Sequence, residues 1–190
     1  MSETTTVTQI PGYLAGTWDI DPIHTDISFT ARHMMVSKVR GHFEKFEGTV
    51  ILADNPLDSH VEVSVEMASI NTNNVDRDNH IRSDDFFGVA QYPTMTYTST
   101  GVHAEGDHFV VDGNLTLHGV TRPVSLDLEV NGFGPDPFGG TRSGFSAKGE
   151  ISRKAFDVKF DAPMEGGGAV VGDKIQLLIE AELILRQDES

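Results

Sequence analysis

Four polar residues between positions 77 and 85 have side chains suited to binding an anion. Arg77, His80, Arg82 and Asp85 place two guanidinium groups and an imidazole within a short stretch of chain. Arginine binds phosphate and pyrophosphate through paired hydrogen bonds, and histidine can donate another. The cluster is therefore a candidate site for an anionic group. Local ion pairs, such as Arg77 with Asp78 and Arg82 with Asp85, account for the same residues equally well.

Two further histidines raise the question of a metal site. His33 and His42 flank a predicted hairpin turn at similar distances, so they could face each other across two strands and offer imidazoles to a metal. No third ligand is evident, and His24 and His118 have no ligand spacing relative to each other. The chain also has no cysteine, which excludes thiolate ligands and disulfides. We expect no metal and no cofactor.

The sequence lacks the motifs of common enzyme classes. It has no G-x-S-x-G elbow, no P-loop and no dinucleotide fingerprint, and the run at 166–168, Gly-Gly-Gly, follows no strand–helix pattern. His80 with Asp85 could form an acid–base couple, but no nucleophile is placed beside it. We therefore expect no catalytic residue.

Charge and composition restrict the partners. Lys and Arg number 14 against 29 Asp and Glu, which gives a net charge of −15. Most of such a surface repels nucleic acid and anionic membranes. No stretch approaches the roughly 18 apolar residues that span a bilayer, so we expect no stable membrane insertion. Residues 1–10 lack the basic start and apolar run of a secretory signal, which predicts a cytoplasmic protein.

Alternation of apolar and polar residues predicts an all-β fold. Period-two patterns occur in the segments 27–33, 40–52, 61–67, 95–97, 111–117, 124–130, 145–151 and 175–183. Short turns such as His118-Gly119 separate the later segments. Eight antiparallel strands with one apolar face each can close into a barrel, whose interior is either filled by side chains or hollow enough for one small ligand. Periodicity does not decide between these two interiors.

Two segments break the alternation. Residues 73–88 have weak helical spacing, and Ser83 and Asp84 could cap a helical turn, which predicts short helices over one barrel mouth. Residues 155–172 contain Pro163 and the glycine run, and predict a mobile loop. The expected organisation is a disordered leader at 1–15, one barrel domain at 16–186 and a tail at 187–190.

Several ordered motifs resemble the YceI-like family of bacterial polyisoprenoid-binding proteins. The opening run Trp18 to Phe29, with His33, is similar to that family's start. The stretch from Asn71 to Pro93, which contains Arg-Asp-Asn-His-Ile-Arg-Ser-Asp-Asp-Phe-Phe, resembles its central signature. Further matches are 113–124, 144–153 and 171–173. The resemblance extends from about Trp18 to Leu185 and keeps the motifs in order.

The resemblance implies an eight-stranded lipocalin-like barrel that holds a long isoprenoid chain in a tunnel, so it favours the hollow interior. Many relatives are exported, whereas this sequence shows no such leader. The lipid tail would contact inward strand positions and the lid, each of which taken singly is more often an ordinary core residue. These positions are Phe29, Phe43, Val63, Val65, Met67, Phe86, Phe87, Tyr97, Leu115, Leu117, Leu126, Phe145 and Ile179.

The functional expectation is therefore a protein that binds a polyisoprenoid, isoprenoid quinone or similar long-chain amphiphile as carrier, store or sensor. The polar end of the lipid would lie at Arg77, His80, Arg82 and Asp85. The alternative is an enzyme that acts on such a lipid through the same four residues. A homodimer formed through an outer sheet face that carries Leu178 and Ile184 is a third possibility.

Overall fold

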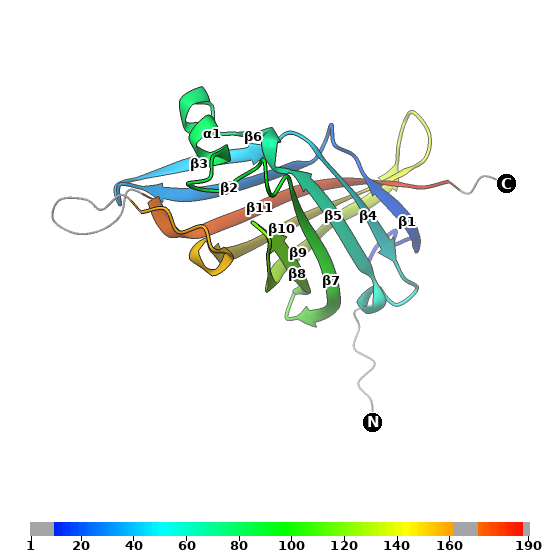
Figure 1. Ribbon diagram of the computed structural model, residues 1–190. Coiled ribbons are helices and arrows are strands. Elements are labelled where there is room, and N and C mark those ends of the chain that lie inside the picture. The colour runs from blue at the N-terminus through cyan, green and yellow to red at the C-terminus, as the bar shows by residue number, and fades with distance from the viewer. Residues whose placement is uncertain (1–9, 162–170, 188–190) are drawn as a thin grey trace.

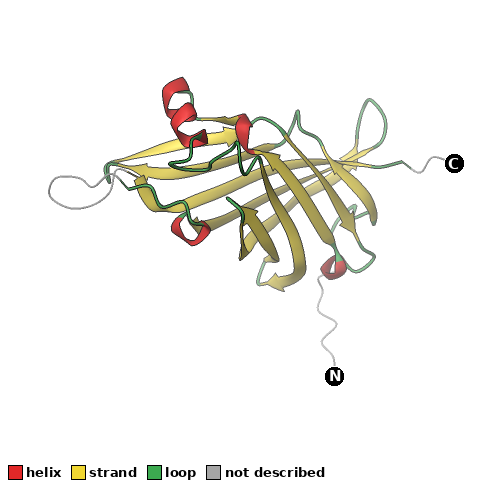
Figure 2. Cartoon of the chain, viewed as in Figure 1, coloured by secondary structure: helices red, strands yellow, loops and turns green. Residues whose placement is uncertain are grey.

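A computed structural model describes residues 10–161 and 171–187, and most of them belong to one antiparallel sheet (Figure 1). The helices are short and lie at its periphery (Figure 2). The strands are β1 (Gly16–Ile20), β2 (Asp26–His33), β3 (Ser37–Phe43), β4 (Phe46–Leu52), β5 (His60–Glu66), β6 (Ile70–Asn71), β7 (Thr94–Glu105), β8 (His108–Leu117), β9 (Val120–Pro135), β10 (Thr141–Ser152) and β11 (Val171–Leu185). The helices are η1 (Pro56–Asp58), η2 (Met67–Ser69), α1 (Val75–Arg82) and η3 (Lys154–Phe156).

The sheet closes into a barrel of eight strands, as the sequence predicted. The order around the ring is β1-β4-β5-β7-β8-β9-β10-β11, and β11 returns to β1 with Trp18 opposite Leu185. The strand β11 is long enough to pair twice. Its N-terminal half pairs with β2, which extends the sheet through β3 to β6. Strands β1 and β2 are thus successive partners of one long strand.

The local turn chemistry matches the observed hairpins. His118 and Gly119 adopt φ values of 55° and 73°, which fits the two-residue turn between β8 and β9 that the sequence predicted. Strands β2 and β3 form the predicted first hairpin. Within the predicted leader, Tyr13 is half-buried, and its hydroxyl donates to the carbonyl of Ala53 at 2.6 Å. Residues 162–170, most of the predicted loop, lie outside the described part.

Helix α1 begins and ends differently from the expectation. Its N-cap is Asn74, whose side chain accepts a hydrogen bond from the Arg77 N–H, and Ser83 is the C-cap instead of a starting residue. The buried carboxylate of Asp78 anchors the helix, because it accepts hydrogen bonds from the backbone N–H and the hydroxyl of Thr72 at 2.9 and 2.5 Å. None of the helices among the described residues is long and apolar enough to cross a bilayer.

Two apolar clusters lie inside the barrel. One is centred on Trp18, Leu52 and Leu183, where β1 closes the ring. The larger cluster joins strand residues to the segments around α1 and η3; its most buried members include Met67, Ile70, Phe86, Phe156 and Val158. This larger cluster closes the interior at the end of the barrel that carries α1.

A close approach between two strands fixes the position of Tyr97. The Tyr97 ring passes over Gly113, where a Cβ atom would lie 2.5 Å from Cζ, and its hydroxyl donates to the carbonyl of Val124 at 2.9 Å. Burial raises the pKa of Tyr97 to about 12. Because its hydroxyl is already bonded to the backbone, Tyr97 presents mainly its ring to the interior.

We predict that Gly113→Ala lowers the free energy of unfolding by about 1–3 kcal/mol, because the new methyl group overlaps the Tyr97 ring and the carbonyl of Thr98. Urea denaturation measures the change. The matched control is Gly134→Ala, where a Cβ atom meets nothing within 4 Å. Equal stabilities for the two variants would contradict the close packing of Tyr97.

Candidate functional site: an apolar cavity in the barrel

The barrel interior contains a cavity of about 240 Å³. Nearly every side chain around it is apolar, and the wall draws on all eight ring strands together with β2 and β3. Inward side chains such as Ile27, Val63 and Ile179 are only half-buried although they lie inside the ring. A solid core would bury such residues. The interior is therefore hollow over the part that these strands enclose.

Nine of the thirteen predicted tail-binding residues line this cavity, namely Phe29, Phe43, Val63, Val65, Tyr97, Leu115, Leu126, Phe145 and Ile179. The other four do not: Met67, Phe86, Phe87 and Leu117 pack in or against the cluster that closes the α1 end. Alternation predicts that these side chains lie inside the fold, but it does not distinguish residues that line a cavity from residues that fill the interior.

The cavity extends to the end of the barrel opposite α1. There its wall includes Ile10 and Tyr13, Pro56 and Ser59 from the β4–β5 connection, and His60 at the start of β5, most of which are partly exposed. The Tyr13 ring also packs edge-on against Phe133. The sequence reasoning missed Ile10 and Tyr13 because the opening segment, rich in Thr and Gly, carries no strand periodicity. The feature of the sequence that could have identified this segment as part of the wall is Tyr13, an isolated aromatic residue before Trp18.

No positive side chain lines the cavity. All 14 Lys and Arg residues lie in the described part of the chain, and none contributes to the wall. Exposed carboxylates flank the wall segments instead: Asp54 and Asp58 lie in the β4–β5 connection, and Glu105 and Asp107 lie at the β7–β8 turn. An anion at this end would meet a negative field with no lysine or arginine in the wall to offset it.

The predicted anion cluster lies elsewhere and is already engaged. Arg77 donates to the hydroxyl and carbonyl oxygens of Thr72, and Arg82 donates to the carbonyls of Ala68 and Ile70 at 2.9 Å each. None of the four predicted residues lines the cavity. The local-anchor explanation is thus closer to the structure, although the partners are mainly backbone carbonyls and not Asp78 or Asp85.

His80 and Asp85 do form a pair, with 2.8 Å between Nε2 and Oδ2. Both side chains are about half-exposed, and the His80 ring packs edge-on against Phe86 and Phe160. These contacts hold the segment that follows α1 against the larger apolar cluster, which closes this end of the barrel. The pair therefore secures the closed end of the barrel.

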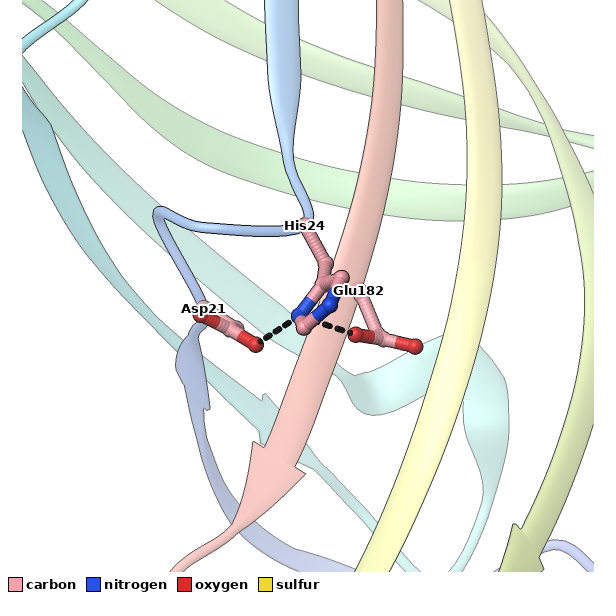
Figure 3. A group of neighbouring side chains, drawn as sticks. All are labelled: Asp21, His24 and Glu182. Atoms are coloured by element: carbon pink, nitrogen blue, oxygen red, sulfur yellow. Dashed lines mark hydrogen bonds and ion pairs between the residues drawn. The ribbon is translucent and has the colours of Figure 1, made fainter.

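A second polar network, which the sequence reasoning did not find, fills the break between β1 and β2 (Figure 3). His24 Nδ1 lies 2.7 Å from Asp21 Oδ2 and 3.1 Å from Glu182 Oε2. Arg142 Nη1 lies 2.8 and 3.1 Å from the same two oxygens, and its Nε lies 2.5 Å from Asp136. Asp21 and Arg142 are 121 positions apart, so no local pattern announces them.

The oxygen and nitrogen atoms of Asp21, His24 and Glu182 lie within 4.8 Å of one another, a spacing that could suit a metal ion. Arg142 already supplies the positive charge that the two carboxylates need, at hydrogen-bonding distance from both. Burial by itself would raise the pKa of Asp21, but hydrogen bonds from His24, Arg142 and the Ile23 N–H lower it to about 2. The group works as a structural ion network that joins β1 and β2 to β10 and β11.

A model of the YceI-like domain matches residues 18–183. The chain belongs to the YceI-like family. It is 42% identical over 139 residues to protein YceI of Escherichia coli O157:H7, which is 73% of each chain. It superposes on the crystal structure of the Campylobacter jejuni YceI protein with a TM-score of 0.72 and 30% identity, covering 82% of this chain and 90% of that one. A polyisoprenoid binding domain from Saccharophagus degradans matches with a TM-score of 0.65 and 15% identity, over 89% and 98% of the two chains.

Two further predictions for this YceI-like protein concern the paired histidines and the outer face of the sheet that could form a dimer. His33 lies opposite Ser37, and His42 lies opposite Ser28, so the two histidines are not cross-strand neighbours and the paired-imidazole prediction is wrong. On the outer face of β11, Leu178 is exposed whereas Ile184 is only half-exposed.

We predict that Asp21→Asn lowers the free energy of unfolding by about 1–3 kcal/mol at pH 7, because the hydrogen bonds of His24 and Arg142 lose their charged acceptor. The pKa of Asp21 is depressed, so its stabilising effect is complete above pH 4 or so and is lost as the pH falls toward about 2. The gap between wild type and variant should close over that range.

Urea denaturation at a series of pH values measures this gap. The control is Asp19→Asn, which removes an exposed pair with Arg186 and should cost less stability than Asp21→Asn. A gap for Asp21→Asn that persists unchanged at pH 2 would contradict the assigned network.

Proposed function

We propose that this YceI-like protein binds one long-chain amphiphilic lipid, of the polyisoprenoid or isoprenoid-quinone type, with its tail inside the barrel. The observation that carries the proposal is the cavity, whose wall is apolar on every strand. The Saccharophagus degradans domain of similar fold is described as polyisoprenoid binding, and its 15% identity relates it to this chain by fold. The lipid would be carried, stored or sensed without any cofactor.

The energetics of such a wall favour a hydrocarbon tail. Each CH₂ group removed from water contributes roughly 0.8 kcal/mol, so several isoprene units give a large gross free energy without any polar contact. Ordering a flexible tail offsets part of that gain. The volume of about 240 Å³ lies just below the roughly 300 Å³ at which ligand pockets commonly begin. A long lipid would therefore widen the cavity or project from the end lined by Ile10 and Tyr13.

The polar end of the lipid is proposed to be uncharged, as in a prenol or a quinone. Arg77 and Arg82, the cations expected to bind a pyrophosphate, are bonded to backbone carbonyls at the closed end. The wall has no Lys or Arg, and carboxylates border its other end. Bringing a phosphate there would desolvate charge without a compensating partner.

Binding, and not catalysis, is the activity that the geometry supports. The one His–Asp pair of the predicted cluster, His80 with Asp85, lies outside the cavity and is held by Phe86 and Phe160. Inside the cavity, the Tyr97 hydroxyl is bonded to a carbonyl oxygen. A lipid in the cavity would meet mainly hydrocarbon.

We predict that protein purified without detergent carries an isoprenoid-type lipid, detectable by native mass spectrometry and solvent extraction. Ala181→Phe should lower the affinity for added prenol by about tenfold, because the ring takes up space that the tail would fill. Because Ala181 also packs against the cluster of Trp18, Leu52 and Leu183, a thermal melt first establishes that the variant is folded. The matched control, Ala104→Phe, adds the same ring at an exposed position outside the cavity. Empty protein from several hosts, with no prenol binding, would refute the proposal.

The headgroup preference has its own test. Geranylgeraniol should bind at least about tenfold more tightly than geranylgeranyl diphosphate, since both carry the same tail and only the second brings phosphate to an acidic rim. Isothermal titration in matched detergent measures both affinities. Replacing Asp54 and Asp58 by Lys should strengthen diphosphate binding and leave geranylgeraniol binding unchanged. A preference for the diphosphate in the unmodified protein would reject the uncharged headgroup.

A further inference from the structure

The tip of the β2–β3 hairpin exposes three successive apolar side chains. Met34, Met35 and Val36 connect the two strands, and all three are exposed, Val36 by 86%. Single exposed apolar residues are ordinary, but three together at the end of a long hairpin form a compact protruding patch. In Figure 1 this hairpin projects from the body of the barrel, at the end away from the N-terminal segment.

The backbone of this tip is unfavourable for the residues that occupy it. Met34 and Met35 have φ values of 53° and 60°, and the Val36 N–H donates to the carbonyl of His33 at 3.2 Å. Two successive residues with positive φ favour Asn and Gly, as in type I′ hairpin turns, because most other residues rarely adopt this conformation. Methionine at these two positions therefore lowers the stability of the protein, both because its φ is unfavourable and because its apolar side chain is exposed to water.

The strands behind the tip carry a second unfavourable arrangement. Arg32 lies directly opposite Lys38, and Arg40 follows on the same outer face, opposite Thr30. Like charges directly across two strands destabilise a sheet. Within residues 10–161 and 171–187, none of these three cations has a carboxylate partner in an ion pair.

We propose that the apolar tip with its three flanking cations docks this protein on an anionic lipid bilayer. Met34, Met35 and Val36 would enter the headgroup region, and Arg32, Lys38 and Arg40 would contact anionic lipid headgroups. Each basic residue near such a surface contributes attraction that salt weakens. Contacts with an external partner of this kind would offset the cost of the turn and of the opposed cations.

The chemistry of the tip favours a bilayer over a second copy of this chain. The net charge of −15 opposes approach to an anionic bilayer as it opposes approach to a second copy, so only the local group of cations and apolar side chains decides between them. The carboxylates of a second copy could attract the cations, but they offer no hydrocarbon to the three apolar side chains. A bilayer supplies both an anionic surface and an apolar layer beneath it. The docking does not depend on what the cavity binds.

Co-sedimentation with phosphatidylcholine vesicles, with and without phosphatidylglycerol, tests the proposal. The wild-type protein should bind the phosphatidylglycerol vesicles, and added salt should release it. The variant Met34→Asn/Met35→Gly should lose this binding while its Tm rises, because it installs the preferred turn. Lys38→Glu should weaken binding about tenfold or more, since it reverses one charge at the surface.

Two controls separate docking from other effects. Phe138→Ser removes an exposed aromatic from a different hairpin tip and should leave vesicle binding unchanged. Ala181→Phe, which fills the cavity, should also bind vesicles normally, so a failure of lipid uptake stays distinct from a failure of docking. Absence of binding to phosphatidylglycerol vesicles, or full binding by the turn variant, would overturn the proposal. So would a tip variant that changes the sedimentation coefficient of the protein alone, because the tip would then join two copies.

Discussion

The closure of the sheet onto itself is the constraint on which the rest of this structure depends. Once β11 pairs with β1, every second residue of eight strands must point into one interior. The side chains present there are apolar but do not fill the space, so a cavity of about 240 Å³ remains. Hollow barrels lose packing contacts that a solid core would have. The backbone hydrogen bonds between the strands and the two apolar clusters must supply the stability that packing across the cavity does not.

The two ends of the barrel are built in different ways. At the α1 end, aromatic and aliphatic residues close the interior, and arginine side chains fasten α1 to the carbonyls beneath it. At the other end, the cavity reaches partly exposed residues among segments that carry carboxylates. The ion network of Asp21, His24 and Arg142 lies where β1 gives way to β2, beside wall residues Thr25 and Ala181. The network thereby holds together β1 and β2, the two successive partners of the single long strand β11.

Period-two alternation was enough to predict most of the strands, and the sequence His118-Gly119 was enough to predict its turn. Alternation could not decide between a hollow and a filled interior, because Met67 and Val63 both face inward while only Val63 borders the cavity. Only the resemblance to the YceI-like family favoured the hollow form. The partners of the arginines could not be predicted for a similar reason: the carbonyls that Arg82 binds belong to η2 and β6, which only the tertiary fold brings to it.

A crystal structure of protein isolated without detergent or added lipid tests the central claim most directly. The account predicts elongated, continuous electron density between Leu126 and Ile179 that extends toward Ile10 and Tyr13, with no side chain of the protein in that space. An interior in which wall side chains meet across the barrel and leave no channel would contradict it, whatever the family of the chain.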